Sequence, residues 1–274
     1  MSRVREEARS PLGLTTLAPG FVTTGLVALL ALSAQAGVLA TVVSVLVVQL
    51  LLASAPSVPG VHRTPVRAPK VVPIAVAGLL AAVVTVWPST AAGARGTSVM
   101  DGAMVESGSL AGIGLALPVL VLLALVAQVR RPAPRTDVVA ALGDVVATGF
   151  VALMVTGWLA AAESPVGRAA VVVAAVVTVI TVAADRPRGP RAVVHVWSLA
   201  ACALIGIVMA SWEGVNAVAG GVAAVAIAAA VLAGRKVGQW WRPLPPARWP
   251  MEVVAPIALA GPVVFVAALL WAGV

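Results

Sequence analysis

The apolar residues of this chain gather in long runs that short basic segments separate. About 20 apolar residues in a helix, at 1.5 Å each, span a hydrocarbon core about 30 Å thick. With 61% apolar and only 10% charged residues, the chain lacks the charge to cover a soluble domain or a disordered segment. The sequence therefore predicts an all-α, polytopic membrane bundle of about nine transmembrane helices, at 20–34, 38–55, 71–88, 111–129, 138–160, 168–184, 192–212, 217–234 and 253–273.

The first apolar run, 20–55, is too long for one ordinary span. Its most turn-like stretch is Ser33-Ala-Gln-Ala-Gly37, so we expect a tight hairpin of two short helices there. One long tilted helix is the competing interpretation and would leave eight spans. Residues 1–19 are then a cytoplasmic N-terminal segment, and 20–274 form a single transmembrane domain.

The basic residues predict the orientation. With nine spans, nearly all of the 18 Lys and Arg fall on one side, and only Arg95 and Arg168 fall on the other. Lys and Arg are retained in the cytoplasm during insertion, which places the N-terminus inside and the C-terminus outside. We expect a bacterial-type inner (cell) membrane. The same orientation puts Trp87, Trp158, Trp212 and Trp271 at outer span ends, where indole rings favour the headgroup level.

Polar residues inside the spans are the best pointer to function, because a buried charge is costly in lipid. Asp144 is the sole acid clearly inside a predicted span, and His195 is the sole histidine inside one. We expect a polar cluster that relays a proton or binds a cation or headgroup, with the candidate residues Asp144, His195, Gln49, Thr178 and Thr181. The alternative is that Asp144 snorkels to the interface or is capped by Thr148 or a loop arginine.

The arginine clusters between spans determine topology in the first instance. They are also candidates for contacts with anionic lipid headgroups, namely Arg130, Arg131, Arg186, Arg188 and Arg191. Membrane lipids are thus the expected partners. A protein partner or a second copy of the chain stays open, and no nucleic acid is expected, because topology accounts for the charge of +8.

Motifs for catalysis are missing from the sequence: it has no Walker loop, no H-E-x-x-H, no G-x-S-x-G and no cluster of Cys or His. We therefore predict no catalytic residue, no metal and no cofactor. The leading interpretation is the membrane subunit of a larger assembly or a permease-like small-solute carrier. Sparse polarity inside the spans favours the subunit. In the last span, Pro256 and Gly261-Pro262 can kink or break the helix, or can belong to a purely structural transmembrane helix.

A lipid-linked enzyme acting on a polyprenyl or phospholipid substrate at the cytoplasmic face is the alternative, with acids at Asp137, Asp144, Asp185 and Glu252. The layout of nine spans with an inside N-terminus resembles that of UbiA-type prenyltransferases, in which Asp-rich motifs after spans 2 and 6 hold Mg²⁺ and diphosphate. Here the segment 56–70 has no acid and the other loop has only Asp185, which argues against that activity.

Overall fold

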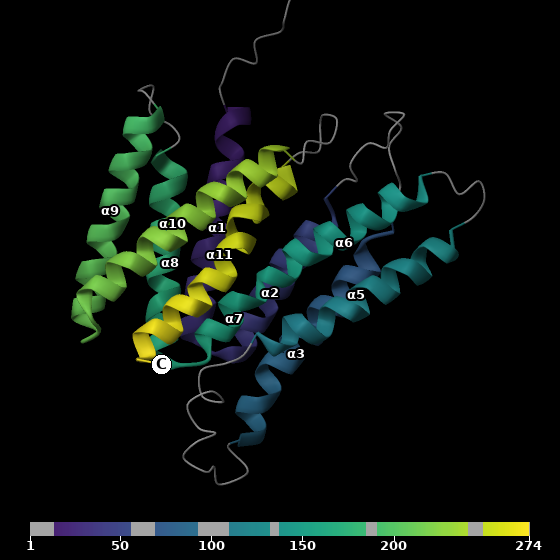
Figure 1. Cartoon of the computed structure of the whole chain (residues 1–274), viewed down its shortest axis with the longest axis horizontal. Coiled ribbons are helices and arrows are strands. Elements are labelled where there is room, and N and C mark those ends of the chain that lie inside the picture. Colours follow the sequence, from purple (N-terminus) through teal and green to yellow (C-terminus); the bar gives the residue numbers. More distant parts are fainter. Residues whose placement is uncertain are drawn as a thin grey trace, which may run out of the picture.

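The computed structural model describes residues 14–55, 69–92, 110–131, 137–184, 191–240 and 249–273, and these are helical apart from short turns (Figure 1). The helices are α1 (Leu14–Ala36), α2 (Val38–Ala53), α3 (Val71–Ala92), α5 (Ala111–Val129), α6 (Val138–Met154), α7 (Thr156–Ala162), α8 (Pro165–Ala184), α9 (Arg191–Trp212), α10 (Ala217–Trp240) and α11 (Trp249–Ala272). Within this part of the chain, seven helical segments are long and apolar enough to cross a membrane, and α2 and α3 are shorter apolar helices. The predicted helical membrane bundle is confirmed.

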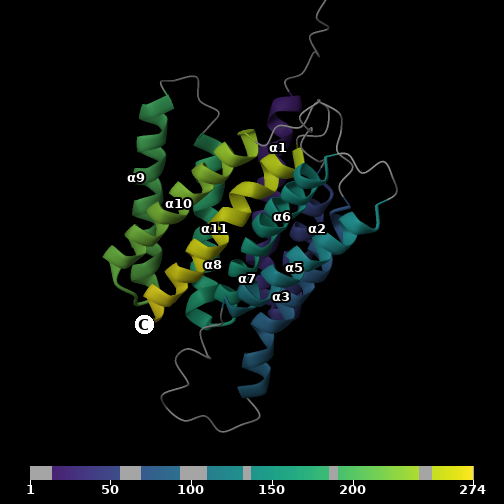
Figure 2. The same cartoon turned by 45° about the vertical axis from the view of Figure 1, so that its right-hand side comes forward.

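The helix ends that flank the basic segments gather at one end of the bundle, at the top of Figure 2. They include the beginnings of α1, α3, α6, α9 and α11 and the ends of α2, α5, α8 and α10. We call this the basic end. The alternation of helix directions agrees with the predicted topology, while the count of nine spans and the side of the membrane stay predictions.

The first apolar run turns back at Gly37, between the end of α1 and the start of α2. Gly37 has φ 125° and ψ 172°, a backbone conformation essentially limited to glycine because any other side chain would clash with the backbone. The turn therefore lies at the end of the stretch that the sequence marked, and glycine makes it possible.

A local tightening divides the predicted span 138–160 into α6 and α7. Val155 N–H donates to Ala152 O and Trp158 N–H donates to Val155 O, at 3.2 and 3.1 Å. These bonds join residues three apart, and Val155 has φ −59° and ψ −26°, as in a 3₁₀ turn. By contrast, α11 is continuous through Pro256 and Pro262. The interruption thus lies between α6 and α7, and no break occurs at the prolines of α11.

At the centre of the bundle, α11 packs against α10, α8, α7, α6, α1 and α2. All residues of α7 are buried. To one side lie α8, α9 and α10, and to the other α2, α3, α5 and α6 (Figures 1 and 2). The neighbourhood of α7 and α11 is therefore the part of the molecule that both groups of helices share.

The four tryptophans expected at outer span ends divide into two kinds. Trp87 and Trp212 are 68% and 84% exposed, as interfacial rings would be. Trp158 and Trp271 are 0% and 5% exposed and belong to the core instead, so for them the prediction was wrong. In addition, α8 begins at Pro165, so Arg168 lies in its first turn rather than in a loop.

Candidate functional site

A buried ion pair joins the beginning of α3 to the interior face of α6. Lys70 Nζ lies 2.8 Å from Asp144 Oδ2, and each side chain is only 3% exposed. Lys70 directly precedes Val71, the first residue of α3, and Asp144 lies about two turns into α6. Both helices start at the basic end, so the pair lies inside the bundle near that end (Figure 2).

Two opposing effects act on the Lys70 ammonium, which precedes the membrane-spanning part of α3. Burial lowers its pKa, and the Asp144 carboxylate beside it raises the pKa through a hydrogen bond and its charge. Apart from the ion pair, Lys70 Nζ and Asp144 Oδ1 have no hydrogen-bond partner within the described residues. The pair is therefore compensated in charge but retains free hydrogen-bonding capacity.

Further buried polar groups follow Asp144 along α6. Thr148 comes one turn later, is 0% exposed, and its hydroxyl has no hydrogen-bond partner in the described part of the chain. Thr156, the first residue of α7, is also 0% exposed. Its hydroxyl accepts a hydrogen bond from Gln49 Nε2 of α2 at 3.2 Å. From Asp144 to Thr156 the helical rise is about 18 Å. We call this set of residues the polar file: Lys70, Asp144, Thr148, Gln49 and Thr156.

Gln49 ties α2 to the junction of α6 and α7. Its Nε2 also donates to Ala152 O at 3.2 Å, one of the carbonyls in the tightened turn. Because a carbonyl can only accept, this bond fixes the orientation of the amide. The amide oxygen then faces α3, where a Cβ at Gly78 would collide with it. Gln49 thus fits only because position 78 is glycine.

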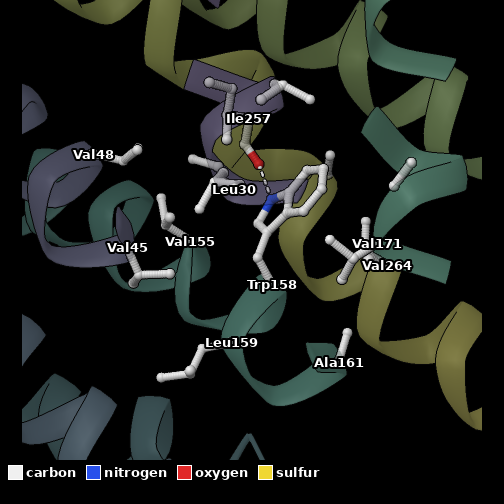
Figure 3. Close-up of a cluster of buried hydrophobic side chains, with 14 of the residues drawn as sticks. Leu30, Val45, Val48, Val155, Trp158, Leu159, Ala161, Val171, Ile257 and Val264 are labelled. Carbon is white, nitrogen blue, oxygen red and sulfur yellow. Dashed lines mark hydrogen bonds between the residues drawn. The ribbon is translucent and has the colours of Figure 1, made fainter. Parts of the chain in front are cut away.

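Trp158, two residues after Thr156 of the polar file, joins α7 to α11 through a hydrogen bond. Its indole Nε1–H donates to Ile257 O at 2.8 Å, and apolar side chains surround the ring (Figure 3). Next to it, the backbones of Gly157 and Gly261 approach so closely that a Cβ at Gly157 would overlap Gly261. The residues after the tightened turn are therefore held against the central helix.

The five predicted cluster residues separate into two groups. Asp144 and Gln49 belong to the polar file, whereas Thr178 and Thr181 lie on α8 and donate to the carbonyls of Ala174 and Val177, at 2.7 and 2.8 Å. His195 lies on α9, which packs on α8 and α10, whereas α6 packs on α2, α3, α5, α7 and α11. The expected Asp144–His195 pair is not formed: Lys70 is the partner of Asp144.

The sequence prediction missed Lys70 because it was counted among the loop cations that determine topology. A signal was present, since the chain has only two lysines among its 18 basic residues, and this one directly precedes an apolar run. Thr148 entered only as a cap for Asp144, and Thr156 was not considered, because a threonine in an apolar helix commonly bonds to its own backbone.

The candidate headgroup contacts are described only in part. Arg130 is exposed at the end of α5, and Arg131 donates from Nη1 to Gln128 Oε1 at 3.2 Å. Arg186 and Arg188 lie outside the described residues, as does the side chain of Arg191. Contacts with anionic lipid thus stay a prediction.

Within the described ranges, no group of three His, Cys, Asp or Glu is arranged to hold a metal ion. The single cysteine, Cys202, is buried, with its sulfur 3.8 Å from Thr181 Oγ1. No family model matches the chain, no curated protein is detectably similar to it, and no solved structure matches it. The polar file is therefore interpreted from its own chemistry.

Proposed function

We propose that this chain is a permease-like carrier that moves a small solute across the membrane, and that the solute's path includes the polar file. The observation that supports this most is the Lys70–Asp144 pair, with both side chains 3% exposed inside a membrane bundle. Ionisable groups there are expensive and mark substrate or ion pathways. Well-packed apolar residues would hold two helices together as well or better, so stability alone does not explain the pair.

The α6–α7 junction provides the second support. Carriers commonly bind solutes where a spanning helix is interrupted near the middle of the bundle. Here the tightened turn at Val155 lies between Thr148 and Thr156 of the polar file, and Gln49 bonds to one of its carbonyls. A short 3₁₀ stretch inside a helix often marks a hinge. We infer that α6 moves relative to α7 at this turn during transport.

The other functions considered from the sequence have weaker support. The membrane subunit of a larger assembly was favoured by sparse polarity inside the spans, and the buried partner of Asp144 weakens that argument. A lipid-linked enzyme would use acids at the basic end. Of these, Asp144 is already paired with Lys70, and Asp185 lies outside the described residues.

Reconstitution in proteoliposomes tests the carrier directly. Solid-supported-membrane currents are recorded for a panel of ammonium, primary amines, amino acids, carboxylates and sugars. We expect the wild type to give a solute-dependent current and Asp144→Asn to abolish it. Thr148→Val should reduce the current several-fold. Thr178→Val is the matched control, because this equally buried threonine bonds to its own helix on α8, away from the polar file.

A double variant separates transport from stability. Asp144→Asn leaves the Lys70 ammonium buried without its counter-charge and should destabilise the bundle by about 3–5 kcal/mol. Lys70→Met combined with Asp144→Met removes both charges and should restore most of that stability, measured by thermal unfolding in detergent. If the double variant also carries the wild-type current, the pair is only a structural link and the proposed path is wrong.

A further inference from the structure

Two of the buried acceptor atoms without partners in the described part of the chain lie beside the Lys70–Asp144 pair, while a third in the polar file, Gln49 Oε1, lies farther along it. Asp144 Oδ1 and Thr148 Oγ1 have no hydrogen-bond partner within the described residues, and they lie one helical turn apart on α6. A buried polar atom without a hydrogen bond is costly, so two of them beside a buried charge require an explanation. A ligand that donates hydrogen bonds and carries positive charge would satisfy both.

The Lys70 side chain indicates which kind of cation binds beside Asp144. Its primary ammonium lies 2.8 Å from Asp144 Oδ2, and both side chains are buried. An ammonium has three N–H donors and needs a few acceptors in a compact arrangement. A hard metal cation prefers about six or more oxygen ligands, whereas Asp144 and Thr148 together offer three oxygens. The donor set therefore favours a protonated amine over a metal ion.

We propose that Asp144 and Thr148 form a binding site for a small protonated amine, ammonium or a primary alkylammonium, and that the Lys70 side chain occupies this site as a tethered competitor. The inference rests on the proposed function, for which it names the class of solute. Exchange of the Lys70 ammonium for a free one keeps the charge at Asp144 balanced. Since Lys70 directly precedes α3 at the basic end, its release would open the site toward that end.

Chemical rescue of a lysine variant tests the site without any transport. The purified full-length chain carrying Lys70→Met is heated in detergent with increasing methylammonium chloride. Sodium chloride and tetramethylammonium chloride at equal ionic strength serve as comparisons, the latter lacking N–H donors. We expect methylammonium alone to raise the melting temperature by several degrees, because a ligand that binds only the folded state stabilises it. Lys70→Gln provides the same measurement if the methionine variant does not fold.

Two further variants assign the effect to the proposed residues. Adding Asp144→Asn to the lysine variant should abolish the methylammonium shift, and adding Thr148→Val should weaken the apparent affinity several-fold. Adding Thr178→Val instead should leave it unchanged. Equal shifts with and without Asp144, or with tetramethylammonium, would overturn the site. Methylammonium binding without solute currents would contradict the carrier but not the site, and currents without methylammonium binding would contradict the site alone.

Discussion

Glu163 is a poorly solvated carboxyl group in the turn between α7 and α8, outside the helical spans. Its side chain is partly buried, and Oε1 has no hydrogen-bond partner within the described residues. Burial raises the pKa of this carboxyl from 4.5 to about 7. Below pH 4.5 the group is protonated in both folded and unfolded chains and contributes nothing. Above pH 7 it is ionised in both, and the folded state bears the poorly solvated charge.

We therefore expect the stability of the wild type to fall as the pH rises from about 4.5 to 7. Glu163→Gln, which is neutral throughout, should melt with the wild type at pH 4.5 and several degrees above it at pH 8. Thermal unfolding in detergent at a series of pH values checks this. If the difference in melting temperature between Glu163→Gln and the wild type is the same at every pH, the carboxyl of Glu163 is well solvated and the prediction is wrong.

Single residues differ in how far the sequence reveals their role. Asp144 was predictable, because a carboxylate inside an apolar run must find a partner. Its partner was not, since His195 lies inside a predicted span and Lys70 directly before another, and only helix packing decides between them. Lys70 is next to Asp144 because α3 and α6 both start at the basic end and pack side by side.

At the scale of the helices, close backbone contacts determine where α7 meets α11. A Cβ at Gly157 would collide with the backbone of Gly261 and Pro262, and one at Gly261 would collide with Met154 O. Small residues allow membrane helices to approach in this way. The sequence showed Gly261-Pro262, but it could not show that the matching glycine, Gly157, lies on α7.

Gly157→Ala should therefore force α7 away from α11 and destabilise the bundle by about 1–3 kcal/mol, as overpacking does elsewhere. Gly143→Ala on α6 is the matched control, because a Cβ there meets no atom within 4 Å. It should be neutral or slightly stabilising. Unfolding in detergent measures both variants, and a loss of stability equal in the two would mean that helix propensity, not the contact, explains it.

Most boundaries of the helices followed from the apolar runs, but α1 begins at Leu14 rather than at residue 20, and α10 continues to Trp240 rather than ending at residue 234. The division between α6 and α7 was not predicted. Boundaries depend on local polarity, which the sequence displays directly. The tightened turn at Val155 is supported from outside, by Gln49 of α2 and by the contact of α7 with α11. The prolines of α11 suggested a break, yet that helix continues, surrounded by neighbours on nearly all sides. Tertiary packing thus outweighed the local signal in both helices.

At the scale of the whole molecule, the two ends of the bundle differ in charge. The segments between helices at the basic end contain most of the chain's arginines, and the turn between α9 and α10 at the other end contains Glu213. Because Lys and Arg stay in the cytoplasm during insertion, the basic end should face the cytoplasm. The proposed amine site, which lies near that end, would then open inward in this conformation.

Cysteine labelling in whole cells tests this orientation. The native Cys202 is 0% exposed and should stay unlabelled, so single cysteines can be introduced at Arg130 and at Glu213, on exposed positions at opposite ends. We expect a membrane-impermeant maleimide to label Glu213→Cys in intact cells and Arg130→Cys only after permeabilisation. The reverse pattern would invert the orientation and place the Lys70–Asp144 pair on the outer side. Labelling of both positions in intact cells would contradict the three crossings between them, made by α6 with α7, by α8 and by α9, and with them the alternating topology.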